Sequence, residues 1–212
     1  MRSPNTHIYS IMKQNAAKIA SIVLHPLFMP LIGVAFTLFY GGYISLLPFQ
    51  VKKVILLVVF ANTLGLPLIM LPLFLRMGII KSLAMENHRE RVFPLIFTLI
   101  PYAFSFYFLY KLPIPTILAT FMLGAAIAVF ATIVITFWWK ISIHMVGIGG
   151  FAGFLMGLSY RLSLDVLFLF IVVVFLSGIL ATSRLMLNSH NQAQVYSGFG
   201  LGFIVLTSIM VL

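Results

Sequence analysis

The chain contains no cysteine, which excludes disulfide bonds, thiolate nucleophiles and Cys-ligated metals. Acidic residues are almost as scarce, since Glu86, Glu90 and Asp165 are the only three in 212 residues. Two-metal hydrolytic sites normally need several carboxylates, so this scarcity argues against such a site. A cleavable signal peptide is not evident either, because the first apolar run begins late and continues into a full membrane span.

Charge of either sign is rare. Charged residues make up 8% of the chain and hydrophobic residues 62%, whereas a soluble domain is usually about 25% charged. A soluble fold of this length could not hide so much apolar surface, so most of the surface must face lipid. The apolar runs are long and do not alternate with period two, which favours helices over a barrel. We predict an all-α, polytopic transmembrane helix bundle.

Seven apolar segments approach the roughly 20 residues that a spanning helix needs. The connections between them are short, and no linker, repeat or low-complexity segment interrupts them. Residues 1–212 therefore form a single transmembrane domain with a short polar N-terminal segment over 1–18. We predict six to seven spans, over approximately 20–40, 53–76, 92–110, 114–138, 143–160, 164–183 and 193–212.

The even-numbered spans all end at the same membrane face. Three of the five histidines and most of the internal cations follow these exits or open the next span. The positive-inside rule would place this face in the cytoplasm, but cations that bind a ligand are poor topology markers, so sidedness is left open. The polar residues gathered at this face are Lys81, His88, Arg89, Arg91, Lys140, Ser142, His144, Arg184 and His190.

The spacing of these residues suits phosphoryl transfer. His190 and Gln194 are four residues apart at the start of the last span, so the Gln carbonyl can accept an imidazole N–H and fix which ring nitrogen is free. Arg184 supplies a forked cationic donor. Ser142 and His144 open the fifth span, where unpaired backbone N–H groups attract anions. One histidine as nucleophile, a second as general acid and a cationic cage would complete such a site.

Some alternatives remain open for individual residues. The net charge of +10 fits either contact with anionic lipid headgroups or a cationic ligand site. Glu86, His88 and Glu90 would be the ligands of a single metal ion, although ion pairs with neighbouring cations are the simpler interpretation. His25, near the start of the first span, is either a functional group or one that makes a local hydrogen bond or lies at the membrane interface.

Glycines are spaced to let two spans approach closely. Gly149, Gly153 and Gly157 form a stripe on the fifth span, and Gly198 and Gly202 form another on the seventh. Small residues at such spacing mark tight helix contacts in membranes. Close packing of these two spans would bring His144 and His190 together. In the second span, an Asn and two Pro predict a kink.

Three motifs at this face resemble those of the type 2 phosphatidic acid phosphatase superfamily. That family carries a Lys followed by Arg-Pro, then Pro-Ser-Gly-His, then Ser-Arg, five residues, His, three residues and Asp. The matches extend over residues 81–194, about half of the chain, with a glutamine where the family has its final Asp and Ile143 where it has Gly. The residues that carry the resemblance are Lys81, Arg89, Arg91, Pro94, Ser142, His144, Ser183, Arg184, His190 and Gln194.

The resemblance implies a metal-independent lipid phosphatase of a bacterial inner membrane. His190 would attack phosphorus to give a phosphohistidine, His144 would protonate the leaving oxygen, and Gln194 would occupy the third catalytic position. The substrate would be a lipid phosphate monoester or a polyprenyl diphosphate that enters sideways from the bilayer. The resemblance implies no cofactor and no nucleic-acid partner, and the oligomeric state is left open. The phosphate would be held by Lys81, Arg89, Arg91, Ser142 and Arg184.

A non-enzymatic binder or carrier of anionic lipids, built on the same basic face, is the main alternative. Gln194 supports it, because an amide does not stabilise the imidazolium that forms during catalysis. A channel or secondary transporter is a weaker hypothesis. Few ionisable residues lie at mid-membrane depth, where a transport path would need them.

Overall fold

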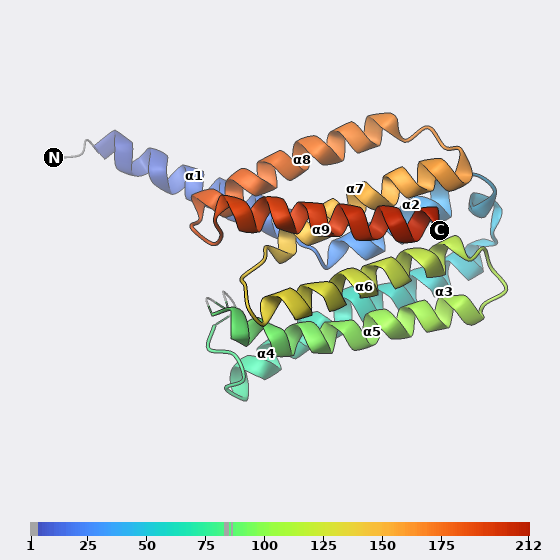
Figure 1. Ribbon diagram of the computed structural model, residues 1–212, viewed down its shortest axis with the longest axis horizontal. Helices are drawn as coiled ribbons and strands as arrows, with labels where there is room; N and C mark the ends of the chain where they lie inside the picture. Colours follow the sequence, from blue (N-terminus) through green and yellow to red (C-terminus); the bar gives the residue numbers. More distant parts are fainter. Residues whose placement is uncertain (1–3, 83–84, 86) are drawn as a thin grey trace.

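A computed structural model describes residues 4–82, 85 and 87–212, with only the backbone described for 4–10 and His88. No strand occurs in these residues, and most of the helices are joined by short connections (Figure 1). Six segments are long and apolar enough to cross a membrane, and a bent helix pair adds a possible seventh. The helices are α1 (Pro4–Val23), α2 (Phe28–Tyr40), α3 (Phe49–Phe60), α4 (Leu66–Arg76), α5 (Val92–Lys111), α6 (Ile117–Thr136), α7 (Ile143–Leu162), α8 (Leu167–Met186) and α9 (Gln192–Val211).

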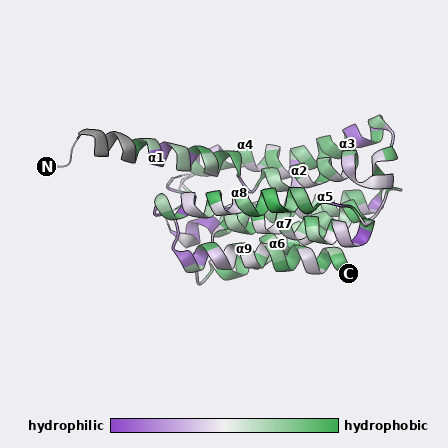
Figure 2. Cartoon of the chain, turned by 90° about the horizontal axis from the view of Figure 1, so that it is seen from above, coloured by the Kyte–Doolittle hydropathy of each residue, from purple (hydrophilic) through white to green (hydrophobic). Residues whose placement is uncertain are grey.

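The prediction of an all-α polytopic bundle with six to seven spans is confirmed. Figure 2 shows hydrophobic residues along the body of the bundle and hydrophilic residues gathered at its two ends. Large apolar side chains such as Ile69, Phe168 and Phe175 are exposed on the outer faces. Such broad apolar surfaces are stable only against lipid tails. The chain is an integral membrane protein.

The first span is broken, which differs from the continuous helix expected over 20–40. α1 and α2 meet at an angle of 53°. Pro26 lies in the break, and a proline ring both lacks an N–H donor and clashes with the preceding helical turn. α1 also runs back through the segment 4–18 that was expected to be a polar tail, and it projects beyond the end of the bundle (Figure 1). It packs against α8.

The second span contains a widened turn between α3 and α4. Residues Ala61–Gly65 form one π-helical turn, which leads directly into α4. Pro67 cannot donate the backbone hydrogen bond that a regular α-helix would require of it. Asn62 lies in this turn and donates from Nδ2 to the Val58 carbonyl at 2.9 Å. Where a kink was predicted, the structure has a π turn within the continuous span Phe49–Arg76, and such turns are often found at functional sites.

α7 and α9 pack backbone against backbone, as the glycine stripes predicted. A Cβ atom added at Gly149, Gly153 or Gly202 would collide with backbone atoms of the facing helix. At one end of this α7–α9 seam, where the two backbones touch, the Ser142 backbone N–H donates to the Gln194 carbonyl at 3.2 Å. The predicted close packing of these spans is therefore confirmed. It places the start of α7 directly beside the start of α9.

Candidate functional site

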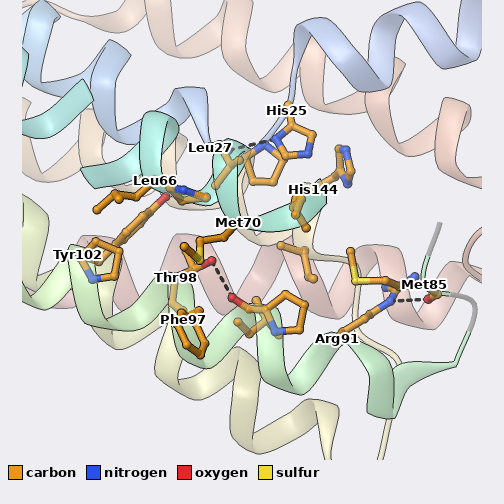
Figure 3. A pocket seen from close by; sticks show the side chains of 18 of the residues that line it. His25, Leu27, Leu66, Met70, Met85, Arg91, Phe97, Thr98, Tyr102 and His144 are labelled. Atoms are coloured by element: carbon orange, nitrogen blue, oxygen red, sulfur yellow. Dashed lines mark hydrogen bonds between the residues drawn. The ribbon is translucent and has the colours of Figure 1, made fainter. Parts of the chain in front are cut away.

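A cavity of about 700 Å³ opens near the end of the bundle at which α7 and α9 begin. Its walls are mostly apolar side chains of α4 and α5, and Figure 3 shows its polar groups on several different elements. Within the described chain, no acidic residue lines it. The cationic and imidazole groups that line it are His25, Arg91, His144, Arg184 and His190.

His190 is held by the capping box that starts α9. The Asn191 side chain accepts from the Gln194 backbone N–H at 2.9 Å, and Gln194 Oε1 accepts from the Asn191 backbone N–H at 3.3 Å. The same Oε1 lies 3.0 Å from His190 Nδ1, so the predicted His190–Gln194 contact is confirmed. Because Oε1 can only accept, His190 carries its hydrogen on Nδ1. Its Nε2 therefore keeps a free lone pair.

That lone pair faces Arg91. Arg91 Nη1 lies 3.5 Å from His190 Nε2, at the outer limit of a hydrogen bond. The guanidinium is oriented from its other side, where Nε donates to the Met85 carbonyl at 2.9 Å (Figure 3). Both Arg91 and His190 are only 7% exposed. The arrangement leaves the remaining guanidinium donors of Arg91 available to a ligand beside Nε2.

Burial keeps His190 neutral. Loss of solvent lowers the pKa of His190 to about 4, outweighing the hydrogen bond that His190 donates to Gln194, which raises it. The positive charges of Arg91, Arg184 and Lys140 lower this pKa further. The imidazole is therefore unprotonated at neutral pH, which is the state that a histidine nucleophile requires.

The end of α1 organises the other side of the cavity. The Ser21 carbonyl accepts from His144 Nε2 at 3.2 Å, and the Ser21 hydroxyl accepts from Arg184 Nη1 at 3.3 Å. The proton of neutral His144 therefore lies on Nε2, and its Nδ1 is the free nitrogen. The His25 ring meets the His144 ring edge to face, with ring centroids 5.0 Å apart and an interplanar angle of 82°. Leu27 N donates to His25 Nδ1 at 3.4 Å.

The structure brings His190, His144, Arg91 and Arg184 to one cavity. Gln194 touches this group through His190 rather than by lining the cavity.

Three residues that the resemblance assigned to phosphate binding lie elsewhere. Ser142 is fully buried at the α7–α9 seam, and its hydroxyl has no hydrogen-bond partner in the described ranges. Lys81 and Arg89 are exposed and do not line the cavity. The Lys81 backbone N–H donates to the Glu90 carboxylate at 3.3 Å, and the Arg89 backbone N–H donates to Asn87 at 3.0 Å.

The single-metal alternative involves residues that the structure does not place. Glu86 lies outside the described residues, and so does the side chain of His88. Among the residues that are described, no group of three or more His, Cys, Asp or Glu side chains is arranged to hold a metal ion.

Ser21 and the Met85 carbonyl are site residues that the sequence did not indicate. Ser21 contacts His144 and Arg184, and Met85 orients Arg91. Two of these three contacts use backbone carbonyls, which every residue possesses and no motif marks. The order of the spans did place the region of Ser21 at the membrane face of the site, because the first span starts at the face where the even-numbered spans end.

Buried guanidinium groups without carboxylate partners indicate an anion site. In the part of the chain that the structure describes, neither Arg91 nor Arg184 forms an ion pair with an acidic residue, and Arg184 Nε is buried without a hydrogen-bond partner. A buried charge without a counter-charge is strongly destabilising, so a bound anion is expected to compensate it. No family model, curated protein or solved structure matches this chain. Its function is therefore argued from the site.

Proposed function

We propose that the chain is an integral-membrane lipid phosphatase that acts through a phosphohistidine on His190. The observation that carries the proposal is the set of two guanidinium groups and three imidazoles around one cavity, with no acidic residue of the described chain among them. Such a set suits a phosphoryl group, whose oxygens accept hydrogen bonds and whose charge the guanidinium groups balance.

His190 would act as the nucleophile. Its Nε2 lone pair attacks phosphorus and forms an N–P bond while the P–O bond to the leaving group breaks. Arg91, 3.5 Å from Nε2, is positioned to hold the equatorial oxygens of the phosphoryl group. Gln194 keeps the hydrogen on Nδ1 throughout. None of these steps requires a metal ion.

His144 would carry the proton. In its protonated form it has a second hydrogen on Nδ1, since Nε2–H is held by the Ser21 carbonyl. That proton passes to the leaving oxygen as the P–O bond breaks. Neutral His144 then accepts a proton from the water that attacks phospho-His190, so that a P–O bond forms, the N–P bond breaks and inorganic phosphate leaves. The cycle returns both histidines to their starting states.

The apolar part of the cavity supports a lipid substrate. Leu66, Ile100 and Phe104 of α4 and α5 line the cavity and are also 44%, 61% and 53% exposed. The cavity thus reaches the lipid-facing surface between these helices. A lipid phosphate monoester or a polyprenyl diphosphate would enter sideways along this path, with its chain against the apolar walls.

The neutral Gln194 favours a second candidate, a non-enzymatic carrier of anionic lipids. In a serine protease, replacing the analogous Asp with its amide lowers turnover by about 10⁴-fold, partly through the wrong tautomer. Gln194 retains the tautomer, as its contact with Nδ1 indicates, but supplies no charge. A carrier would bind lipid phosphates at the same cations without releasing inorganic phosphate.

Phosphate release by the purified protein tests the proposal. The protein in detergent would be given lipid monophosphates and polyprenyl diphosphates with a chelator present. Wild type should release phosphate, and His190→Ala should abolish release. A ³²P-labelled substrate should leave an acid-labile, base-stable label on the wild-type protein. Lipid binding without phosphate release would establish the carrier instead, and release that survives His190→Ala would reject His190 as nucleophile.

A further inference from the structure

His25 offers a hydrogen-bond donor that the steps above do not use. Its Nδ1 accepts from the Leu27 backbone N–H at 3.4 Å, so the hydrogen of the neutral ring lies on Nε2. Among the described residues, Nε2 has no hydrogen-bond partner, and His25 lines the cavity. The ring donates from Nε2 whether it is neutral or charged, so its capacity to bind an anionic oxygen does not depend on titration.

The position of His25 is defined by its contact with His144. The two rings meet edge to face with centroids 5.0 Å apart, and Figure 3 shows both rings at one side of the cavity, away from Arg91. Ser21 holds Arg184 near the same two histidines. The cavity therefore has Arg91 and His190 on one side and His144 and His25 on another, with Arg184 close enough to act on both groups.

Because displacement at phosphorus proceeds in line, the two sides of the cavity contact different parts of the substrate. The attacking nitrogen, phosphorus and leaving oxygen lie roughly on a line. With His190 as nucleophile and His144 beside the leaving oxygen, His25 faces the atoms that follow that oxygen. In a lipid monophosphate the next atom is a carbon, which offers no acceptor. In a lipid diphosphate the next group is a second phosphate with two non-bridging oxygens.

We infer that His25 forms a leaving-group subsite that selects lipid diphosphates over lipid monophosphates. His25 Nε2–H donates to a non-bridging oxygen of the chain-side phosphate, and Arg184, which lies near both groups of cationic and imidazole side chains, adds positive charge. The bond between the terminal phosphorus and the bridging oxygen breaks, the terminal phosphoryl group passes to His190, and the lipid monophosphate departs. This inference rests on the proposed phosphatase function and assigns its substrate class.

The choice of substrate tests the inference. Phosphate release would be followed for a polyprenyl diphosphate and for the monophosphate of the same chain, in wild type, His25→Ala and His25→Gln. We expect His25→Ala to lower kcat/KM for the diphosphate by about 10-fold to 100-fold, the size of one lost hydrogen bond to a charged group. The monophosphate should change by less than about 3-fold. His25→Gln, whose amide nitrogen can replace Nε2–H, should restore most of the preference.

Lys18→Ala is the matched control, because it removes an exposed cation from the neighbouring helix α1. An equal loss on both substrates in His25→Ala and His25→Gln would mean that His25 only positions His144, and would overturn the inference. A wild-type protein that hydrolyses only the monophosphate would also overturn it. If wild type releases phosphate from neither substrate, the proposed function itself fails.

Discussion

A single added negative charge beside His190 provides a quantitative test of the site. Gln194→Glu keeps the side-chain length, so one carboxylate oxygen remains about 3 Å from His190 Nδ1 and still accepts from the Asn191 backbone N–H. Two unit charges about 4 Å apart interact by roughly 4 kcal/mol at an effective dielectric constant of about 20. At about 1.4 kcal/mol per pKa unit, this equals about three units. The pKa of His190, about 4 in the native protein, should rise to about 7.

Nitrogen NMR of protein labelled on its five histidines measures this shift directly, with His190→Ala identifying the signal. The same substitution should change the reaction rate in opposite directions at high and at low pH. At pH 8 turnover should increase, since the carboxylate stabilises the cationic ring that forms on phosphorylation. Below pH 7 kcat/KM should fall, since protonated His190 cannot attack. Gln194→Asp, which introduces the acidic residue that the resembled motif has at this position, should also raise turnover at pH 8. A His190 pKa that stays near 4 in Gln194→Glu would refute the hydrogen-bonding geometry.

Three further predictions concern stability and ligand binding. Because the pKa of His190 is lowered on folding, the unfolded chain takes up the proton first, so thermal stability should decrease as the pH falls from about 6.5 to 4. His190→Asn should flatten this slope in a thermal unfolding series, and an unchanged slope would contradict the buried, neutral imidazole. Gly202→Ala should destabilise the protein by about 1–3 kcal/mol through overpacking. Gly200→Ala should not, because a Cβ at Gly200 meets nothing within 4 Å. Equal melting temperatures for the two variants would refute the backbone contact between α7 and α9. Arg91→Ala should weaken the binding of vanadate, a phosphate analogue, by about 10-fold or more, and the control Arg89→Ala should change the affinity by less than about 2-fold. Calorimetry measures both affinities, and equal losses in the two variants would place the anion away from Arg91.

The spans were predictable because the bilayer fixes their length and polarity. Each expected segment from the second to the seventh overlaps a helix of the structure, with ends that differ by a few residues. The order of the spans also determined which loops share a face, so His144, Arg184 and His190 were expected together before any coordinates. The glycine stripes added the pairing of α7 with α9, since residues without side chains mark where two backbones can touch.

Details that depend on local backbone direction were not predictable. Pro26 was visible in the sequence, but the size of the bend and the helical form of residues 4–18 depend on packing against α8. Arg89 and Arg91 are two residues apart in one short 3₁₀ segment, yet only Arg91 lines the cavity. Spacing in a loop does not determine which side chain points inward.

The contact between α7 and α9 also sets which parts of the protein can move. The two helices act as one stiff unit, because their backbones touch at Gly149, Gly153 and Gly202 with no Cβ between them. This pair of helices carries His144 at the start of α7, and His190 lies just before the start of α9. In the proposed phosphatase, widening of the cavity for a bulky lipid would come from other lining elements, such as α4 and α5, and would leave the spacing of the two imidazoles unchanged during each cycle.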